Sequence, residues 1–177
     1  MSKNILLTGA SGGIGYKVFQ QLLKSQKYNL TIFIRKSRKN IKRFKSFDNQ
    51  VKIKFGDLTQ KEDLTQICEP YDAVIHLAAI IPPIAYKSQA NTYKVNVLGT
   101  QLLIRHFESY CPKAFFMFSS SVAIYGDRLK KPEIRVSDPL HEDDEDFYVQ
   151  SKIKAEQVVQ HSQLHWTIFR LTAILGV

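Results

Sequence analysis

A cluster of glycines near the start of the chain constrains the fold more than any other feature. Thr8 to Gly15 reads TGASGGIG and holds four of the eight glycines in a chain of 177 residues. Glycine is costly in ordered structure, so such a cluster indicates a backbone that turns tightly or lies very close to another group. The apolar run around it predicts a strand over residues 4–9, and the pattern after it predicts a helix over residues 14–24.

Apolar runs alternate with helical patterns along the rest of the chain. Further strands are expected at residues 29–35, 51–57, 71–79, 114–121 and 166–174. Further helices are expected at residues 62–68, 89–108 and 147–162. Strands that alternate with helices predict a parallel sheet covered on both faces. The expected fold class is therefore α/β, a doubly wound parallel sheet of the Rossmann type, in which ligands bind at the carboxyl ends of the strands.

Length and composition narrow the remaining possibilities. With 177 residues, of which 44% are hydrophobic, the chain suits one domain with a proper core, and it has no apolar run long enough for a membrane span. The apolar run near the N-terminus is too short for a signal peptide, and Cys68 and Cys111 lack metal-ligand spacing. We therefore expect a cytoplasmic protein with free thiols, no metal site and no membrane partner.

The charge of the chain raises the question of a nucleic-acid partner. The net charge is +9, and a dense basic run extends from Arg35 to Lys45. Such runs can mark nucleic-acid binding, but more often they are solvated faces of helices or loops. Because a more specific use for Arg35 follows below, no nucleic-acid partner is expected. The acidic stretch at residues 141–146 is expected to be an exposed loop.

The glycine cluster has the spacing of a phosphate-binding turn. Gly9, Gly12 and Gly15 fit G-x-x-G-x-x-G, directly after a strand and at the start of a helix. A turn without side chains there lets backbone N–H groups and a helix N-terminus reach a pyrophosphate. The stretch therefore predicts dinucleotide binding, with a purely structural turn as the alternative. The residues expected to bind the dinucleotide here are Gly9, Ser11, Gly12, Gly13, Ile14 and Gly15.

The end of the second strand indicates which dinucleotide binds. An NAD site usually has Asp or Glu there to accept a hydrogen bond from the ribose 2′-hydroxyl, but this chain has Arg35. A cation cannot accept that bond, whereas it can hold a 2′-phosphate, so NADP is favoured over NAD. The alternative is a basic loop that never touches the cofactor. Two later strand ends are expected to contact the adenosine half, through Asp57 and Leu58 in GDL and through Leu77, Ala78 and Ala79 in HLAA.

Three polar residues follow later strand ends in a pattern that suits proton and hydride transfer. Tyr148 and Lys152 are four residues apart on a predicted helix, so they share a face. A nearby ammonium stabilises a phenolate, so Lys152 is expected to lower the pKa of Tyr148 and to bond the ribose beside the nicotinamide. Ser121 lies at the end of the fifth strand, where its hydroxyl could bond a substrate oxygen while Tyr148 exchanges a proton. Taken alone, each residue also fits an ordinary surface or strand-end position.

In this order the motifs resemble the short-chain dehydrogenase/reductase superfamily, in its extended branch of NAD(P)-dependent epimerases, dehydratases and reductases. The resemblance covers essentially all 177 residues and rests on TGASGGIG, GDL, HLAA, VNVLGT, FSSSVAIYG, YVQSK and FRLTAILG. It implies that Ser121, Tyr148 and Lys152 are catalytic, and that Asn96 supports their network. It also implies that Arg170 opens a segment running along the nicotinamide edge of the site.

Two departures from the family pattern limit what the resemblance implies. Sugar-nucleotide dehydratases usually carry an Asp-Glu pair after the catalytic hydroxyl residue, and this chain has Val122 and Ala123. Extended members also continue into a C-terminal domain that closes over the substrate. Residues 1–177 are therefore expected to form an NAD(P)-binding domain truncated before the substrate domain, which binds a dinucleotide more readily than it turns over a substrate.

The resemblance leaves more than one function open. The first is hydride transfer at a secondary alcohol or ketone of a small molecule, possibly a nucleotide sugar, either by an epimerase that holds NAD or by a reductase that uses NADP. The second is a non-catalytic dinucleotide sensor of the same fold. In either case a homodimer through the helices at 89–108 and 147–162 is a further expectation.

Overall fold

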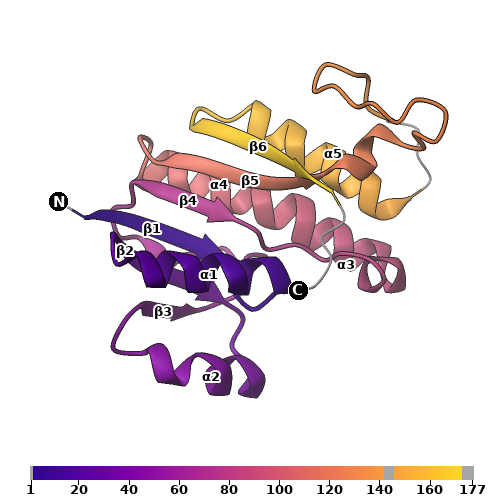
Figure 1. The fold of residues 1–177 in the computed structure, drawn as a ribbon. Helices are drawn as coiled ribbons and strands as arrows, with labels where there is room; N and C mark the ends of the chain where they lie inside the picture. The colour runs from indigo at the N-terminus through magenta and orange to yellow at the C-terminus, as the bar shows by residue number, and fades with distance from the viewer. Residues whose placement is uncertain (1, 142–145, 173–177) are drawn as a thin grey trace.

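A six-stranded parallel sheet forms the centre of the protein, whose computed structural model describes residues 2–141 and 146–172 (Figure 1). The strands are β1 Lys3–Thr8, β2 Tyr28–Ile34, β3 Lys52–Phe55, β4 Ala73–His76, β5 Phe115–Ser121 and β6 His165–Leu171. Their order across the sheet is β3-β2-β1-β4-β5-β6, and each neighbouring pair is parallel. The predicted α/β fold with a doubly wound parallel sheet is confirmed.

Helices lie on both faces of this sheet (Figure 1). One face carries α1 Gly13–Ser25 and α2 Arg38–Phe44, and the other carries α4 Gly99–Tyr110 and α5 Phe147–Gln160. The shorter helical segments are η1 Lys45–Phe47, η2 Glu62–Ile67, η3 Ile84–Lys87, α3 Gln89–Tyr93, η4 Lys94–Leu98 and η5 Val122–Tyr125. All strands point the same way, so β1, β4, β5 and β6 end at a common edge, where ligands of such sheets bind.

Burial explains why the strands read as continuous apolar runs. The neighbouring side chains of Leu6 and Leu7 in β1 are both fully buried, because successive residues of a strand point to opposite faces. Leu6 belongs to the core under α4 and α5, which contains Phe107. Leu7 belongs to the core under α1 and α2, which contains Phe19.

The structure refines several predicted elements. The helix expected at residues 89–108 runs from Gln89 to Tyr110 but contains a π-helical turn at Lys94–Leu98. The strand expected at residues 71–79 ends at His76, because the next residues leave the sheet and turn towards its edge. The basic run contains α2. Ser37 caps the start of this helix, because its side chain accepts a hydrogen bond from the Asn40 N–H. Residues 173 and 174 of the last expected strand lie outside the described residues.

The glycine turn between β1 and α1 is built from very close backbone contacts. Gly9 has a φ of +77°, and its carbonyl accepts a 2.9 Å bond from the N–H of Gly12. A Cβ on Gly15 would lie 2.0 Å from the carbonyl oxygen of Gly9, which leaves no space for any side chain. Gly12 is different, because the nearest atom to a Cβ there is 3.4 Å away.

These contacts predict opposite outcomes for two alanine substitutions in the same turn. Gly15→Ala is expected to lower the free energy of unfolding by about 2 kcal/mol or more, because the added Cβ must push the turn and α1 apart. Gly12→Ala, the matched control, is expected to stay within about 1 kcal/mol of the wild type. Urea unfolding of both variants measures this difference. Equal stability of the two variants would show that the backbone at Gly9 and Gly15 can move apart to admit a Cβ without cost.

Candidate functional site

A cleft of about 830 Å³ lies at the carboxyl edge of the sheet. It is bounded by the glycine turn, the segments after β4 and β5, the first turns of α5 and the end of β6. Ten of the predicted site residues line it: Gly9, Gly12, Gly13, Ile14, Gly15, Leu77, Ala79, Ser121, Tyr148 and Lys152. Residues that are more than 140 positions apart in the chain therefore meet in one cavity.

Ser121, Tyr148 and Lys152 come together in this cleft from two elements. Ser121 ends β5, and its Oγ accepts a 3.2 Å bond from the N–H of Ala123. Tyr148 lies in the first turn of α5, with its hydroxyl near enough to Ser121 for that side chain to lower its pKa. Lys152 follows one turn later, and its Nζ donates a 2.5 Å bond to the carbonyl oxygen of Ser119. The α5 helix starts at the right place because Asp146 caps it, accepting bonds from the N–H groups of residues 148 and 149.

Burial controls the protonation of these groups. The Lys152 side chain is 3% exposed, and burial lowers its pKa to about 7, against the opposing effect of the Glu156 carboxylate. Burial also raises the pKa of Tyr148, although the nearby Ser121 side chain opposes this. The expected lowering of the Tyr148 pKa by Lys152 is therefore wrong in this structure, because the amine is turned to the Ser119 carbonyl. Tyr148 is a protonated hydroxyl, and hence a hydrogen-bond donor, at neutral pH.

Asn96 lies in the π-helical turn and bonds two other elements. Its Oδ1 accepts a 2.7 Å bond from the N–H of Ile80, and its Nδ2 donates to the Ile80 carbonyl and to Ser151 Oγ at 3.0 and 2.9 Å. Ser151 precedes Lys152 on α5, so the amide ties the segment after β4 to the helix that carries Tyr148 and Lys152. Asn96 does not line the cleft itself among the described residues, and it therefore acts on the site through its neighbours.

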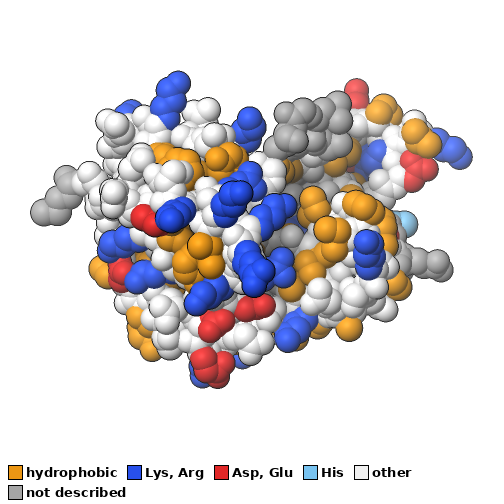
Figure 2. Space-filling view, turned by 90° about the horizontal axis from the view of Figure 1, so that it is seen from below, with side chains coloured by type: hydrophobic (Ala, Val, Ile, Leu, Met, Phe, Trp, Pro, Cys, Tyr) orange, Lys and Arg blue, Asp and Glu red, His pale blue; other side chains and the backbone are white. Residues whose placement is uncertain are grey.

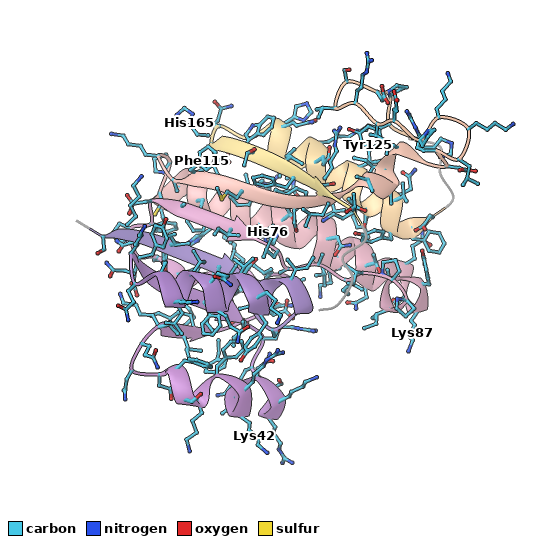
Figure 3. All side chains as sticks on the ribbon, in the orientation of Figure 1. Lys42, His76, Lys87, Phe115, Tyr125 and His165 are labelled. Carbon is cyan, nitrogen blue, oxygen red and sulfur yellow. The ribbon has the colours of Figure 1, made fainter. Side chains whose placement is uncertain are left out.

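Sequence reasoning missed the histidine of HLAA. His76 ends β4 and is fully buried at the centre of the molecule (Figure 3). Its Nδ1 lies 2.7 Å from Thr8 Oγ1, and its Nε2 lies 2.9 Å from Thr100 Oγ1, which itself donates to the Asn96 carbonyl at 2.7 Å. A hydroxyl has one proton, so Thr100 must accept from Nε2–H while Nδ1 accepts from Thr8. Burial lowers the pKa of His76 to about 3, which agrees with this neutral form.

The second residue that sequence reasoning missed is Arg43 of α2. Lys and Arg side chains gather on the face of the molecule shown in Figure 2, and Figure 1 shows that α2 lies on this side. Arg43 of α2 donates a 2.9 Å bond to the carbonyl of Ser11 in the glycine turn, and its guanidinium stacks 3.9 Å from the ring centre of Tyr16. Arg35 directly follows β2 and is exposed, and its carbonyl accepts a 2.7 Å bond from the Asn40 side chain. The position after the second strand predicts Arg35 as the contact to a 2′-phosphate, but it does not indicate a residue of the following helix.

The other predicted residues lie beside the cleft rather than in its lining. The Asp57 carboxylate accepts a 2.9 Å bond from the N–H of Thr59, and Asp63 accepts one of 2.7 Å from the N–H of Asp57. Leu58 is buried beneath Gly99, and Ala78 donates its N–H to Thr8 Oγ1 at 3.4 Å.

The segment after β6 lines the cleft, but Arg170 does not. Leu171 and Thr172 are part of the lining, whereas the guanidinium of Arg170 is bound on the other side of the strand. Val122 and Ala123, the departures from the dehydratase pattern, also line the cleft. Neither can transfer a proton.

None of the helices in the described residues is long and apolar enough to cross a membrane. The expected cytoplasmic location and homodimer stay predictions. Tyr93 and Leu98, each 40% exposed, lie on the helices through which the dimer is expected.

Comparison with known proteins places this site in a family. A sequence model of the NAD dependent epimerase/dehydratase family matches residues 5–177. A curated relative is the N-acetyl-alpha-D-glucosaminyl-diphospho-ditrans,octacis-undecaprenol 4-epimerase of Escherichia coli O157:H7, which is 29% identical over 99% of this chain and 50% of its own length. The chain thus spans about half the length of this relative.

Solved structures share the fold. The UDP-Glc/GlcNAc 4-epimerase of Campylobacter jejuni has a TM-score of 0.81 and 24% identity, covering 96% of this chain and 53% of that one. The Bordetella bronchiseptica enzyme WbmH, solved in complex with NAD+, has a TM-score of 0.80 and 19% identity, covering 99% and 57%. With the family match extending over nearly the whole sequence, the chain belongs to the NAD dependent epimerase/dehydratase family.

Proposed function

We propose that the cleft binds a nicotinamide dinucleotide and that the chain carries the hydride-transfer site of an oxidoreductase or epimerase acting on a sugar diphosphate. The observation that carries this proposal is the convergence of the glycine turn with Ser121, Tyr148 and Lys152 in one cleft. The C. jejuni and E. coli relatives are named as 4-epimerases of a UDP-linked and a polyprenyl-diphosphate-linked sugar. Both names describe epimerisation at carbon 4 of a sugar that is linked to a diphosphate.

The glycine turn fits the pyrophosphate of such a cofactor. Gly12 is the N-cap of α1 in an extended conformation, no side chain caps the helix, and its first turn carries no acidic residue. The N–H groups at this helix end are therefore open to an anion, and the helix dipole favours negative charge there. The bound nicotinamide supplies the hydride chemistry, and the protein supplies binding, orientation and proton transfer.

The proton chemistry follows from the protonation states in the cleft. Because Tyr148 keeps its proton at neutral pH, it can donate to the oxygen of a ketone as that carbon is reduced. Ser121, which lines the cleft with Tyr148, is placed to hold the same oxygen. Lys152 supplies a buried donor beside them that suits a ribose hydroxyl. In the reverse direction the alcohol gives up its proton, and Tyr148 can accept it only as the phenolate that remains after it has donated. The oxidation half of an epimerisation therefore requires Tyr148 to have lost its proton first.

The departures at Val122 and Ala123 favour epimerisation or simple redox chemistry over dehydration. Elimination of water needs a group that removes a proton from carbon and another that protonates the leaving hydroxyl. The two positions after Ser121 hold apolar side chains, so they supply neither group. We therefore propose oxidation and re-reduction at a sugar carbon as the leading reaction, with single reduction of a ketone as the alternative.

Tyr148→Phe tests the catalytic proposal. In a preparation of the protein that turns over a UDP-linked or polyprenyl-diphosphate-linked hexosamine, the substitution is expected to lower the rate about 10²–10⁴-fold, because the proton donor is gone. Dinucleotide affinity is expected to stay unchanged, as measured by calorimetry. Tyr110→Phe, on the exposed end of α4, is the matched control and should alter neither quantity. Turnover that survives in Tyr148→Phe would refute the role given to this residue, and a dinucleotide sensor would be the better reading.

A second test concerns the choice between NADP and NAD. We propose that Arg35 and Arg43 hold a 2′-phosphate at the adenosine end, because Arg43 is fixed against the glycine turn and Arg35 directly follows the adjacent strand β2. Arg35→Ser or Arg43→Ser is expected to weaken NADP binding about 10–100-fold, the value of one charge-assisted bond, and to leave NAD binding much less affected.

Lys24→Ser, which removes a positive charge at the far end of α1, is the control for general electrostatics. Calorimetric titrations with both dinucleotides give the comparison. Equal affinity of the wild type for NAD and NADP would show that neither arginine contacts a phosphate.

A further inference from the structure

A buried ion pair lies one helical turn from Lys152 and is formed by two side chains that the mechanism above does not use. Glu156 of α5 is 1% exposed, and Arg170 of β6 faces it. Arg170 Nε donates to one carboxylate oxygen at 3.0 Å, and its Nη2 donates to the other at 2.8 Å. Such a two-point bond fixes the relative position of two elements, because both partners are planar and matched in shape.

Arg170 reaches a third and a fourth segment with its remaining nitrogen. Its Nη1 donates to the hydroxyl of Tyr125 and, at 3.1 Å, to the carbonyl of Val136. The guanidinium carbon also lies 5.0 Å from the centre of the Tyr125 ring. Tyr125 ends the η5 turn that starts after Ser121, and Figure 3 shows it beside the end of β6. One guanidinium therefore joins β6, α5, η5 and the loop that follows η5.

These same segments carry the cleft residues. Tyr148, Lys152 and Glu156 follow one another at intervals of four on α5, so they form one stripe along the helix. Ser121 is the N-cap of η5, and the side chains of Ile124 and Tyr125 pack against Val149 and Ile153, the neighbours of Tyr148 and Lys152. A shift of α5 against η5 would thus separate Ser121 from both residues.

We propose that Arg170 and Glu156 are positioning residues for Ser121, Tyr148 and Lys152. They do not touch the reacting atoms. They hold the helix that carries Tyr148 and Lys152 in register with the turn that begins at Ser121, and they place a negative charge one helical turn from the buried amine. The catalytic meaning of this device rests on the proposed function, whereas its geometry and its effect on Lys152 can be measured without turnover.

The charge effect has a definite sign. His76 on β4 and Glu156 on α5 interact electrostatically with the Lys152 amine. Tyr148 lies one turn away on α5, and Arg170 of β6, which also bonds Tyr125 of η5, is paired with Glu156. His76 is neutral and Tyr148 is protonated, so Glu156 is the negative group that favours the ammonium. Removing this carboxylate must lower the pKa of Lys152, because Arg170 then remains as an uncompensated positive charge.

Glu156→Gln tests the charge effect, since glutamine keeps the shape and can still accept a bond from Arg170. The titration of Lys152 is followed by NMR of the side-chain Nζ, assigned by its loss in Lys152→Arg. The midpoint is expected to fall by about one pH unit relative to the wild type. NADP and NAD affinity is then expected to be about tenfold weaker at about pH 8 and equal to the wild type at about pH 5, where the amine is charged in both proteins.

Arg170→Lys tests the geometric effect. It keeps the positive charge but loses the fork that spans Glu156, Tyr125 and Val136. It is expected to leave the Lys152 midpoint near its wild-type value and to weaken dinucleotide binding at both pH values. Glu69→Gln is the matched control, because it breaks an ion pair with Lys52 and Lys54 outside the cleft. It should change neither the midpoint nor the affinity.

The possible results separate this proposal from the proposed function. If the Lys152 midpoint and the affinity of both variants match the wild type while only thermal stability falls, the pair is merely structural and the proposal is overturned. If no protein binds NAD or NADP, the proposed function fails, but the Lys152 midpoint in Glu156→Gln still decides the positioning claim. Should the variants not fold, the wild-type chain is the test: the Arg170 Nε–H must be protected from solvent exchange, and exchange as fast as in an exposed arginine refutes the pair.

Discussion

The contact between Gly9 and Gly15 is the constraint on which the rest of the site depends. It brings the start of α1 against the end of β1, with no space for a side chain between them. Gly9 is also close to the backbone of the segment after β4, since a Cβ there would lie 2.6 Å from atoms of Leu77 and Ala78. The turn thus fixes the positions of α1, β1 and the segment after β4 relative to one another. The uncapped N-terminus of α1 at this turn is what makes the edge of the sheet suited to a pyrophosphate.

A network of buried polar groups connects the glycine turn to the candidate catalytic residues on α5. Thr8, at the end of β1, bonds His76, which bonds Thr100, which bonds the Asn96 carbonyl. Asn96 then bonds Ser151 beside the catalytic candidates on α5. Each member has its donors and acceptors matched, and a matched network in a buried place specifies one arrangement of the elements around it. The π-helical turn at Lys94–Leu98 belongs to the same feature, because it is where the Asn96 side chain and carbonyl both find partners.

The sequence predicted the fold and ten of the residues that line the cleft, for reasons that can be stated residue by residue. Strand and helix alternation and the glycine spacing are local signals, so β1, α1 and the turn between them were predictable. The four-residue interval between Tyr148 and Lys152 was also visible. The roles of His76, Arg43, Glu156 and Arg170 were not, because each depends on a partner at least 14 residues away. The pKa of Tyr148 was predicted in the wrong direction, since burial and the orientation of the amine cannot be read from spacing.

The buried amine of Lys152 shows how such long-range partners set the chemistry. Burial lowers its pKa to about 7, and Glu156 opposes that effect, so the group is poised between its two forms at neutral pH. A dianionic pyrophosphate at the glycine turn adds negative charge to the same cleft and must favour the ammonium further. Binding of such a ligand then takes up a proton whenever the pH is near or above the pKa of the free protein. Holding the amine near its midpoint makes its charge responsive to the ligand, which an exposed lysine with an ordinary pKa could not provide.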